Sequence, residues 1–530
     1  MLSAPRKCGA FSTCVASTWI RSDSFDYLKQ TIDNRVYEAA VQTPLTFAPA
    51  LSKQLASDCK VFLKREDLQP TFSFNVRGAH NKIASLTKLQ RQNGIVACAA
   101  GNHLHGVAYS ATKLGISARM IVPIGSMDHQ LSFLQNDYIE IVEHGYHFED
   151  AMRHAIQIAQ NERRAFIHPF DDPMIIAGNG TVGMEILRQM SGKWPDAIFI
   201  PVGGGGLIAG IAAYVKQIAP NVSIIGVEES GANLLQASLE AKGRIRFTNV
   251  NCFTNDVAMK ELGQENFRIC ANFVDEVITV TTDEICSAIR DVFGDTRSLM
   301  EPLGALSVAG VKKYAGTNGS GRKYVAILAA ANMDFDRLRF ISERSDDRER
   351  LMSVQIPERR GAFQQLYDLI FPYNVTEFTY RMASQHDTVA QIYLSIQTKT
   401  DSEFHEVLAR INTQEGIRAT DQSQNELTKA HLRYLGTGRT EATTTERLFR
   451  MSFPERPGAL KDFLDCVSHS NHKWNISLFH YRNHGADIGR VLVAFQVLHS
   501  ENEAFEGFLQ HLNFVFFEET QNPAYQQFIL

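Results

Sequence analysis

Cysteine is scarce in this sequence, and the few that occur are scattered. There are eight cysteines in 530 residues, and no two of them stand in the CxxC spacing of redox or zinc motifs. A long chain with few, dispersed cysteines is typical of a reducing compartment with free thiols rather than of a disulfide scaffold. No apolar run approaches the roughly 18 residues of a membrane span. We therefore expect a soluble protein with no membrane partner.

The sequence also lacks an excess of charge of one sign. Lys and Arg number 53 against 58 Asp and Glu, which gives a formal net charge of −5, and no basic stripe is present. This balance gives no reason to expect a nucleic-acid partner. Hydrophobic residues make up 44% of the chain, which is ample for packed cores. At this length two to four domains are expected.

Acidic residues are absent from the first 22 positions, which contain Arg6, Lys7 and Arg21 together with several Ser and Thr. The composition is compatible with an organelle transit peptide. It is equally compatible with a short flexible tail, which we favour because the basic residues are few. We treat residues 1–30 as a flexible N-terminal segment. We expect a cytoplasmic protein, with an organelle matrix as the alternative compartment.

From about 31 to 342 the sequence alternates short β-branched runs with longer helical patterns. Continuous apolar strands separated by helices predict parallel sheets that are covered on both faces. We therefore expect an α/β region over 31–342. The expected buried strands are Val61–Leu63, Ile95–Cys98, Met120–Val122, Ile198–Ile200, Ile224–Val227 and Val325–Leu328.

An internal repeat follows the charge-rich segment Glu343–Arg350, which we interpret as a solvated linker or helix face. Pro357–Phe363 recurs as Pro454–Leu460, offset by 97 residues, and Asn374–Arg381 recurs as Asn475–Arg482, offset by 101. Each copy reads strand, Pro-Glu-x-x-Gly turn, helix, strand, which predicts an α+β unit of βαββαβ size. The expected units cover residues 351–424 and 447–518.

Four consecutive glycines give the strongest local signal. Gly203, Gly204, Gly205 and Gly206 directly follow an expected strand and precede a helical pattern that begins at Leu207. Such a turn lets the backbone fold tightly around an anion, with N–H groups and a helix N-terminus facing it. The spacing is not the G-x-G-x-x-G fingerprint of dinucleotide binding. We predict an anion cradle rather than a flexible turn.

A second polar segment, Ala99–Gly106, stands at the C-terminal end of another expected strand, where ligand sites form in α/β folds. A purely structural interpretation of its Asn102 is that the side chain caps the following helix. His103 and His105 lack metal-ligand spacing with any other candidate residue. We therefore interpret both histidines as packing or helix-surface residues.

Together these segments resemble the pyridoxal-phosphate threonine dehydratases, in the long form with two C-terminal ACT-like domains. The tetraglycine turn is similar to the family's phosphate loop. Ala99–Gly106 is similar to its Ser-Ala-Gly-Asn-His-Ala-Gln-Gly motif, and Ser73–Ala79 to its Ser-Phe-Lys-x-Arg-Gly-Ala motif. Further similar segments, which extend the resemblance over nearly the whole chain, are Lys64–Pro70, His168–Asp171, Ala177–Thr181 and Arg337–Ser342.

The resemblance implies a two-lobed α/β catalytic region of PLP fold type II, as in the β subunit of tryptophan synthase, and two α+β ACT-like regulatory domains. It implies that Gly203–Gly206 and Leu207 hold the phosphate of pyridoxal phosphate and that Asn102 binds its ring oxygen. The family reaction converts L-threonine to 2-oxobutanoate and ammonia in isoleucine biosynthesis. Isoleucine or valine would be effectors, and a homo-oligomer, by resemblance a tetramer, would form. The repeat has a second interpretation, as an oligomerisation module alone.

Three positions depart from the family pattern, and all three belong to the expected active site. Asn75 stands where the family has the lysine that forms the Schiff base with the cofactor and then moves protons. Ala329 replaces a serine that hydrogen-bonds the pyridine nitrogen, and Leu303 replaces a usual serine. Because a carboxamide is neither basic nor nucleophilic, Asn75 can do neither of the lysine's jobs.

Two functional hypotheses follow. In the first, which we favour, the chain is a catalytically silent or strongly impaired family member that binds pyridoxal phosphate non-covalently at best. It would then act as a regulatory or binding subunit, alone or assembled with an active paralogue. In the second, it is an active threonine ammonia-lyase that tolerates Asn75. Lys64 and Lys82 are near this position in sequence, and we expect both to be solvated or salt-bridged rather than substitutes for the missing amine.

Overall fold

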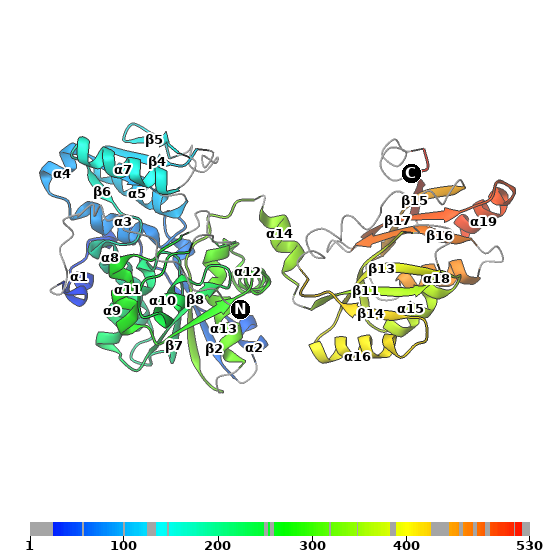
Figure 1. The fold of residues 1–530 in the computed structure, drawn as a ribbon. Coiled ribbons are helices and arrows are strands. Elements are labelled where there is room, and N and C mark those ends of the chain that lie inside the picture. The colour runs from blue at the N-terminus through cyan, green and yellow to red at the C-terminus, as the bar shows by residue number, and fades with distance from the viewer. Residues whose placement is uncertain are drawn as a thin grey trace, which may run out of the picture. The chain divides into compact units, whose positions relative to one another are not determined.

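The computed structural model divides into two compact units, Met1–Ser345 and Asp346–Leu530 (Figure 1). It describes residues 25–521 except for 56–57, 99–100, 125–133, 146–147, 248–252, 255–258, 317–319, 336, 347, 382–387, 426–444, 455–458, 470–473, 483–487 and 513–514. Most of the expected N-terminal segment, the first two residues of Ala99–Gly106 and the second Pro-Glu-x-x-Gly turn therefore lie outside the described residues.

Two sheets form the first unit. In order, the six-stranded sheet contains β1 (Leu45–Phe47), β2 (Lys60–Arg65), β10 (Lys323–Leu328), β7 (Ala197–Pro201), β8 (Ser223–Glu229) and β9 (Glu276–Val280). The four-stranded sheet contains β5 (Ile139–Glu143), β4 (Ala118–Val122), β3 (Ile95–Cys98) and β6 (Ala165–Ile167). Apart from the short edge strand β1, which is antiparallel to β2, all neighbouring strands are parallel. The prediction of parallel sheets is confirmed.

Helices connect these strands and cover the sheets. They are α1 (Tyr27–Ile32), α2 (Pro49–Gln54), α3 (Asn75–Ala84), α4 (Lys88–Asn93), α5 (Asn102–Leu114), α7 (Phe148–Asn161), α8 (Pro173–Gln189), α9 (Gly206–Ile218), α10 (Leu234–Glu240), α11 (Gln264–Phe273), α12 (Thr282–Thr296), α13 (Pro302–Ala315) and α14 (Arg337–Arg344). Local sequence explains several starts: Asp172 caps α8 ahead of Pro173, and Thr281 with Glu284 forms a capping box at α12. Within the described residues, no helix is both long and apolar enough to cross a bilayer.

Side chains along the central strands point alternately into two apolar cores, because both faces of each sheet are covered. In β3, Ile95 and Ala97 pack into a core that includes residues of α3 and α5, whereas Val96 and Cys98 pack into a second core with α7. All four side chains are fully buried. A side-chain period of two on a strand with helices on both sides explains why the sequence shows a continuous apolar run here.

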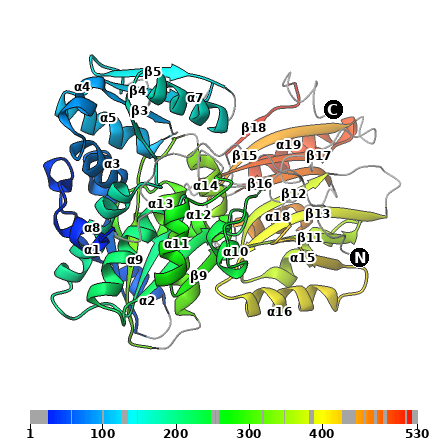
Figure 2. The same ribbon diagram turned by 60° about the vertical axis from the view of Figure 1, so that its left-hand side comes forward.

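The second unit is an eight-stranded antiparallel sheet built from two similar halves, which can be followed in Figure 2. The first half is β11 (Glu349–Pro357), α15 (Ala362–Ile370), β12 (Asn374–Arg381), β13 (Val389–Gln397), α16 (Asp401–Asn412) and β14 (Arg418–Asp421). The second is β15 (Glu446–Pro454), α18 (Ala459–His469), β16 (Asn475–Arg482), β17 (Ile488–Gln496), α19 (Asn502–His511) and β18 (Val515–Glu518). Each half is a βαββαβ unit, as predicted, and β12 pairs with β16 to join them.

The sequence repeat has a structural counterpart in buried polar contacts. Thr376 Oγ1 donates to Glu349 Oε1 at 2.5 Å in the first half, and Ser477 Oγ donates to Glu446 Oε1 in the second. These residues are offset by the same 97 and 101 positions as the repeated motifs. One apolar core containing residues of α15, α16, α18 and α19 lies against the sheet. The repeat therefore extends from the sequence pattern to individual side-chain contacts.

Candidate functional site

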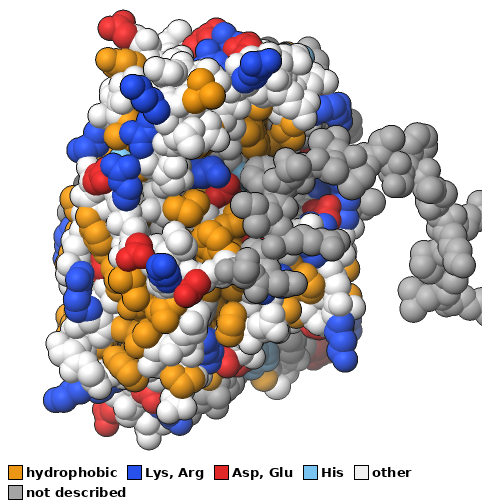
Figure 3. Space-filling view, turned by 90° about the vertical axis from the view of Figure 1, so that its left-hand side faces the viewer, with side chains coloured by type: hydrophobic (Ala, Val, Ile, Leu, Met, Phe, Trp, Pro, Cys, Tyr) orange, Lys and Arg blue, Asp and Glu red, His pale blue; other side chains and the backbone are white. Residues whose placement is uncertain are grey.

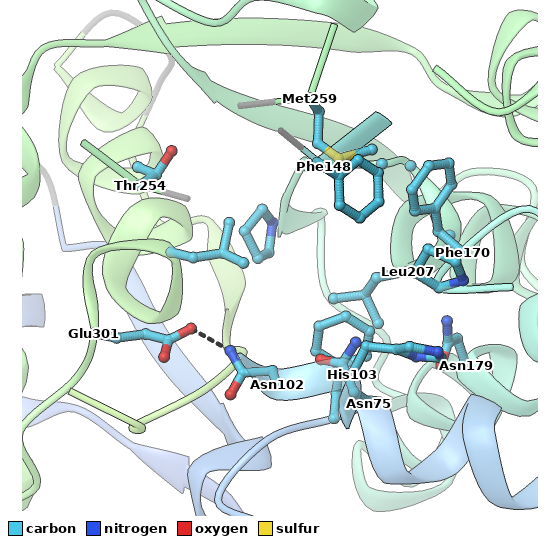
Figure 4. Close-up of a pocket in the computed structure, with 18 residues that line it drawn as sticks. Asn75, Asn102, His103, Phe148, Phe170, Asn179, Leu207, Thr254, Met259 and Glu301 are labelled. Carbon is cyan, nitrogen blue, oxygen red and sulfur yellow. Dashed lines mark hydrogen bonds between the residues drawn. The ribbon is translucent and has the colours of Figure 1, made fainter. Parts of the chain in front are cut away.

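A pocket opens in the first unit where the glycine turn meets segments from both sheets (Figure 4). It encloses about 940 Å³ of space counted out to its mouth. The strand β7 delivers the glycine turn, and α3 and α5 bring their first residues to the wall. The lining residues are Phe74, Asn75, Asn102, His103, Phe148, Pro169, Phe170, Asn179, Pro201, Gly203, Gly204, Gly205, Gly206, Leu207, Thr254, Met259, Glu301 and Leu303.

Close approach and backbone conformation explain why the turn consists of glycines. A Cβ on Gly204 would lie 2.4 Å from the ring of Phe170, and one on Gly206 would lie 2.9 Å from the Phe170 carbonyl oxygen. Gly205 has φ of +88° and stands just before α9, in a region that L side chains rarely adopt. The turn therefore packs tightly against Phe170 and leads directly into the N-terminus of α9, the arrangement expected of an anion cradle.

Hydrogen bonds hold the segment that packs on this turn. Asn266 Nδ2 donates to the Gly204 carbonyl at 2.8 Å and to the Phe170 carbonyl at 3.2 Å. The backbone N–H groups of Phe170 and Asp171 donate to His168 Nδ1, which requires that nitrogen to be unprotonated. Burial lowers the pKa of His168, in agreement with this acceptor role. Sequence reasoning missed Asn266 because it lies about 60 residues from the turn and carries no motif of its own.

Asn102 does not cap α5, so the capping interpretation is wrong. The N-cap is Gly101, which makes no side-chain cap bond. Asn102 Nδ2 instead donates to Glu301 Oε1 at 2.6 Å, and Asn102 Oδ1 accepts from Asn332 Nδ2 at 2.6 Å. Glu301 was missed as a site residue. Its only sequence signal is its place immediately before Pro302 at the start of an apolar helix.

The two histidines of α5 behave as predicted. His103 is buried, and its Nε2 lies 3.3 Å from the carbonyl oxygen of Ile167. Burial lowers the pKa of His103 to about 4, so the imidazole is neutral at physiological pH. His105 is partly exposed on the helix. Within the described ranges no group of three or more His, Cys, Asp or Glu side chains is placed to hold a metal ion.

Asn75 is the first residue of α3 and lies at the pocket wall. Its Oδ1 accepts from Ser73 Oγ at 2.7 Å, and its backbone N–H donates to Ser73 Oγ at 3.2 Å. Directly behind it, the carbonyl of the fully buried Ala329 accepts from the backbone N–H of Phe74 at 3.0 Å. Position 329 is not part of the described wall, whereas Leu303 is. The structure thus brings the two altered positions 75 and 329 together through the backbone.

Neither candidate lysine replaces the missing amine at this wall. Lys64 is fully buried, and its Nζ lies 2.5 Å from Glu185 Oε2 and 2.7 Å from the Thr43 carbonyl oxygen. Lys82 Nζ forms an ion pair with Asp172 Oδ2 at 2.7 Å. Neither lines the pocket. Both were expected to be solvated or salt-bridged, and the structure shows that both form salt bridges.

A buried ionic network lies beneath the wall and anchors α3. Arg77, two residues after Asn75, contacts Glu66 Oε2 and Glu185 Oε1, each at 2.7 Å, with all three side chains fully buried. Burial alone would raise the pKa of Glu66, but the guanidinium of Arg77 outweighs it and lowers that pKa. Because a charge left alone in this interior would be costly, the network fixes α3 relative to β2 and α8.

Comparison with known proteins defines the class first. The family model described as "Pyridoxal-phosphate dependent enzyme" matches residues 36–330, and that described as "C-terminal regulatory domain of Threonine dehydratase" matches twice, at 341–432 and 438–529. Threonine deaminase isoform 2 from Solanum lycopersicum, in its processed form, has a similar structure. Its TM-score is 0.58 at 37% identity, and the match covers 60% of this chain and 87% of that one. The first unit thus has the fold of this class of pyridoxal-phosphate enzymes.

Curated relatives narrow the assignment. Biosynthetic L-threonine dehydratase IlvA of Burkholderia multivorans is 43% identical over 96% of this chain and 99% of its own length. Mitochondrial threonine dehydratase of Schizosaccharomyces pombe is 45% identical over 95% of this chain and 84% of its own. The chain belongs to the threonine dehydratase family, in the form with two C-terminal regulatory domains.

Proposed function

We propose that this chain is a catalytically silent or strongly impaired threonine dehydratase. The observation that carries this proposal is Asn75, at the pocket wall, in the position of the family's Schiff-base lysine. Pyridoxal phosphate, when bound, makes the Cα proton of an amino acid acidic by drawing charge into its ring. Of the residues described around the pocket, none offers an amine that captures the aldehyde or moves that proton. At the described wall the family reaction, from L-threonine to 2-oxobutanoate and ammonia, therefore lacks the lysine amine that would serve as its covalent anchor and move its protons.

The pocket still fits the non-covalent part of cofactor binding. The turn of Gly203, Gly204, Gly205 and Gly206 with the N-terminus of α9 suits a phosphate group, and Leu207 completes that end. Asn179 Oδ1 is buried at this wall without a hydrogen-bond partner among the described residues. A buried polar atom in this state is costly unless a ligand or water satisfies it. These features support retained binding, with Asn102 near the ring, and they do not restore chemistry.

Absorption spectroscopy with borohydride trapping tests the proposal. Purified chain mixed with pyridoxal phosphate should show no covalent adduct after reduction, and threonine deamination should be absent or far below an ordinary enzyme rate. A reduced adduct mapped to Lys64 or Lys82, or threonine turnover at an ordinary rate, would instead establish an active threonine ammonia-lyase. Threonine turnover at an ordinary rate is the outcome expected if this chain has the activity that the names of the curated relatives state.

The second unit, we propose, binds isoleucine or valine. A pocket of about 510 Å³ lies between the β11–α15 turn of the first half and α18 of the second. Its wall includes Arg360 and Gln364, whose Nη1 and Oε1 atoms are buried without partners among the described residues. A guanidinium suits a carboxylate, and an amide oxygen suits an ammonium. Apolar side chains of Phe363, Leu464 and Val467 line the remainder, as an aliphatic amino acid requires.

Calorimetry on the full-length chain tests effector binding. Isoleucine or valine should release or absorb heat at millimolar concentration, and Arg360→Met should remove that signal because the carboxylate loses its buried partner. Arg410→Met, on the exposed face of α16, is the matched control and should leave binding unchanged. Absence of heat and of a thermal shift in the unmodified chain would favour the other interpretation of the repeat, a module for oligomerisation alone.

We further propose that the chain forms a homo-oligomer, by resemblance to the family a tetramer, or joins an active paralogue. The face of the first unit that carries α1 gathers hydrophobic side chains among scattered charges (Figure 3). Ile32, the last residue of α1, is exposed by 56%, and Tyr37 and Val41, between α1 and β1, are exposed by 41% and 46%. A large exposed apolar patch typically marks a protein interface, and we propose that these residues contribute to one. Light scattering should give a mass above 59.3 kDa, and Ile32→Asp should reduce it whereas Leu89→Asp on α4 should not.

A further inference from the structure

Opposite ends of the pocket differ in electrostatic character. The glycine turn and the N-terminus of α9 favour an anion, because a helix N-terminus carries partial positive charge. Glu301 lies on the other side of the view from Phe170, with Asn75 between them (Figure 4). Among the described residues of the wall it is the one side chain with a formal charge at neutral pH. A ligand that matches both ends is negative at one end and positive at the other.

Position 75 determines which charge faces this carboxylate. A lysine would place an ammonium at the wall, whereas Asn75 presents a neutral carboxamide held by Ser73. The neighbouring His103 is neutral because of its lowered pKa, and the described wall contains no lysine or arginine. The carboxamide of Asn75 is neutral and its Oδ1 already accepts from Ser73 Oγ, whereas Glu301 is a carboxylate that accepts from Asn102 Nδ2. The far end of the pocket therefore suits a group with positive charge.

We propose that this pocket selects a phosphate ester that carries a primary ammonium group, and takes pyridoxamine phosphate in preference to pyridoxal phosphate. The inference rests on the proposed silent function and names its ligand. An aldehyde is uncharged, and without a lysine it gains no covalent bond in this pocket. An ammonium on the same ring is attracted by the carboxylate of Glu301.

Isothermal titration of the full-length chain with three ligands tests this preference. Pyridoxamine phosphate, pyridoxine phosphate and pyridoxal phosphate share the ring and the phosphate but carry an amine, a hydroxyl and an aldehyde. Pyridoxine phosphate is the matched neutral control. We expect the amine to bind at least about tenfold more tightly than either of the others, since only the amine forms a charge pair with Glu301. Similar affinity for the amine and the hydroxyl ligand, or no binding of any of the three, overturns the proposal.

Two variants locate the source of the preference. Glu301→Gln should weaken pyridoxamine phosphate about tenfold and leave pyridoxine phosphate unchanged, which also reports an intact fold. The control Glu240→Gln, at an exposed position at the end of α10, should change neither. Asn75→Lys should reverse the order, because its ammonium form repels the amine ligand, whereas its neutral amine condenses with the aldehyde to an imine and releases water. An unchanged preference in both Glu301→Gln and Asn75→Lys contradicts the proposal.

The outcomes separate this inference from the silent function on which it rests. The ratio of affinities is measured without turnover, whereas threonine deamination is a separate assay. A silent chain with no preference for the amine retains the proposed function and loses the inference. A chain that deaminates threonine at an ordinary rate loses the proposed function, whatever its affinities are.

Discussion

Two ends of the pocket match the family pattern to different degrees: the phosphate end, formed by Gly203–Gly206, and the reactive end, around Asn75. At the phosphate end the four glycines are intact, and Gly204 and Gly206 still have the close packing against Phe170 that excludes a side chain. At the reactive end Asn75 and Ala329 stand where the resemblance implies a Schiff-base lysine and a ring-binding serine, although the backbone around them is hydrogen-bonded. Binding and chemistry use different residues, so one can be lost while the other persists.

Beneath the reactive end, the buried network argues that the scaffold itself is under constraint. Lys64, Glu66, Arg77 and Glu185 keep short ion pairs in a fully buried setting. If the fold were no longer maintained, such contacts would be expected to be lost early, because removal of one partner leaves the other charges buried and unpaired. The difference between the two ends is the one expected under the proposed function, a loss of reactivity within a maintained binding fold.

Asn75→Lys gives the largest expected effect, because it converts the reactive end back to the family pattern. The variant should capture pyridoxal phosphate covalently and gain threonine deamination that the unmodified chain lacks. Turnover should return only in part, since position 329 still lacks a hydroxyl and one preorganised polar contact is worth on the order of 10²-fold in rate. Adding Ala329→Ser should raise the rate beyond the single change, as both residues act on one cofactor. Deamination assays and borohydride trapping measure both effects.

Asn75→Met is the control for this experiment, since it adds length at position 75 without an amine and should gain nothing. If Asn75→Lys neither captures the cofactor nor deaminates threonine, the reactive end has decayed beyond positions 75 and 329. The contrast between the two ends would then be one of structure as well as of chemistry.

Removal of Arg77 tests whether the scaffold is maintained. Arg77→Met leaves Glu66 and Glu185 buried near Lys64 alone, and we expect it to lower the free energy of unfolding by about 3–5 kcal/mol. Arg119→Met is a matched control: Arg119 also contacts two carboxylates, Glu140 and Glu162, but at the surface. Exposed pairs contribute about 0–1 kcal/mol. Denaturant unfolding that shows equal losses for the two variants would rule out a special role for the buried network.

The pH dependence of stability reports on His103. Its pKa in the folded chain is about 4, below the ordinary value near 6.5, so the unfolded chain binds a proton that the folded chain does not. Stability from this source is present above pH 6.5 and is lost as the pH falls towards 4, by about 3 kcal/mol in total. His103→Gln keeps a donor for the Ile167 carbonyl but does not titrate. The stability difference between variant and parent should therefore shift by that amount across this window, and a constant difference would contradict the assignment.

Sequence alone predicted the interior strands of the two sheets in the first unit and the glycine turn because their signals are local, whereas the edge strands β1, β5, β6 and β9 were not predicted. A run such as Ile95–Cys98 is apolar at every position since both faces of its sheet are covered, and four glycines after a strand permit few alternatives. Asn75 stood out because it interrupts an otherwise matching motif. Phe170 and Glu301 were not predicted as wall residues, although Phe170 lies within the similar segment His168–Asp171 and Glu301 is two residues before Leu303, because their contacts at the pocket depend on tertiary packing.

The same limit explains why the capping interpretation of Asn102 was incorrect. Asn102 stands at the start of a helix, where an asparagine commonly caps, and local sequence cannot show that Gly101 takes that position instead. Its partners Glu301 and Asn332 lie 199 and 230 residues away. Hydrogen bonds of this kind depend on how the two sheets of the first unit pack, which no local pattern encodes.

Gly204→Ala addresses the phosphate end and has the smallest expected effect on stability. Its Cβ would meet the Phe170 ring at 2.4 Å, and overpacking of this kind typically costs about 1–3 kcal/mol. Gly294→Ala is the matched control, because that glycine lies within α12 with nothing within 4 Å of the new Cβ, and alanine should stabilise the helix by about 0.5–1 kcal/mol. Thermal unfolding measures the stability of each variant.

Titration with pyridoxine phosphate measures the affinity of each variant for a phosphate ligand. Because the ring of Phe170 must shift to admit the methyl group, Gly204→Ala should also weaken the phosphate ligand, whereas Gly294→Ala should leave it unchanged. If Gly204→Ala binds the ligand as tightly as the parent, ligand binding does not depend on the close packing of the glycine turn against Phe170. The contrast between the phosphate end and the reactive end then does not hold.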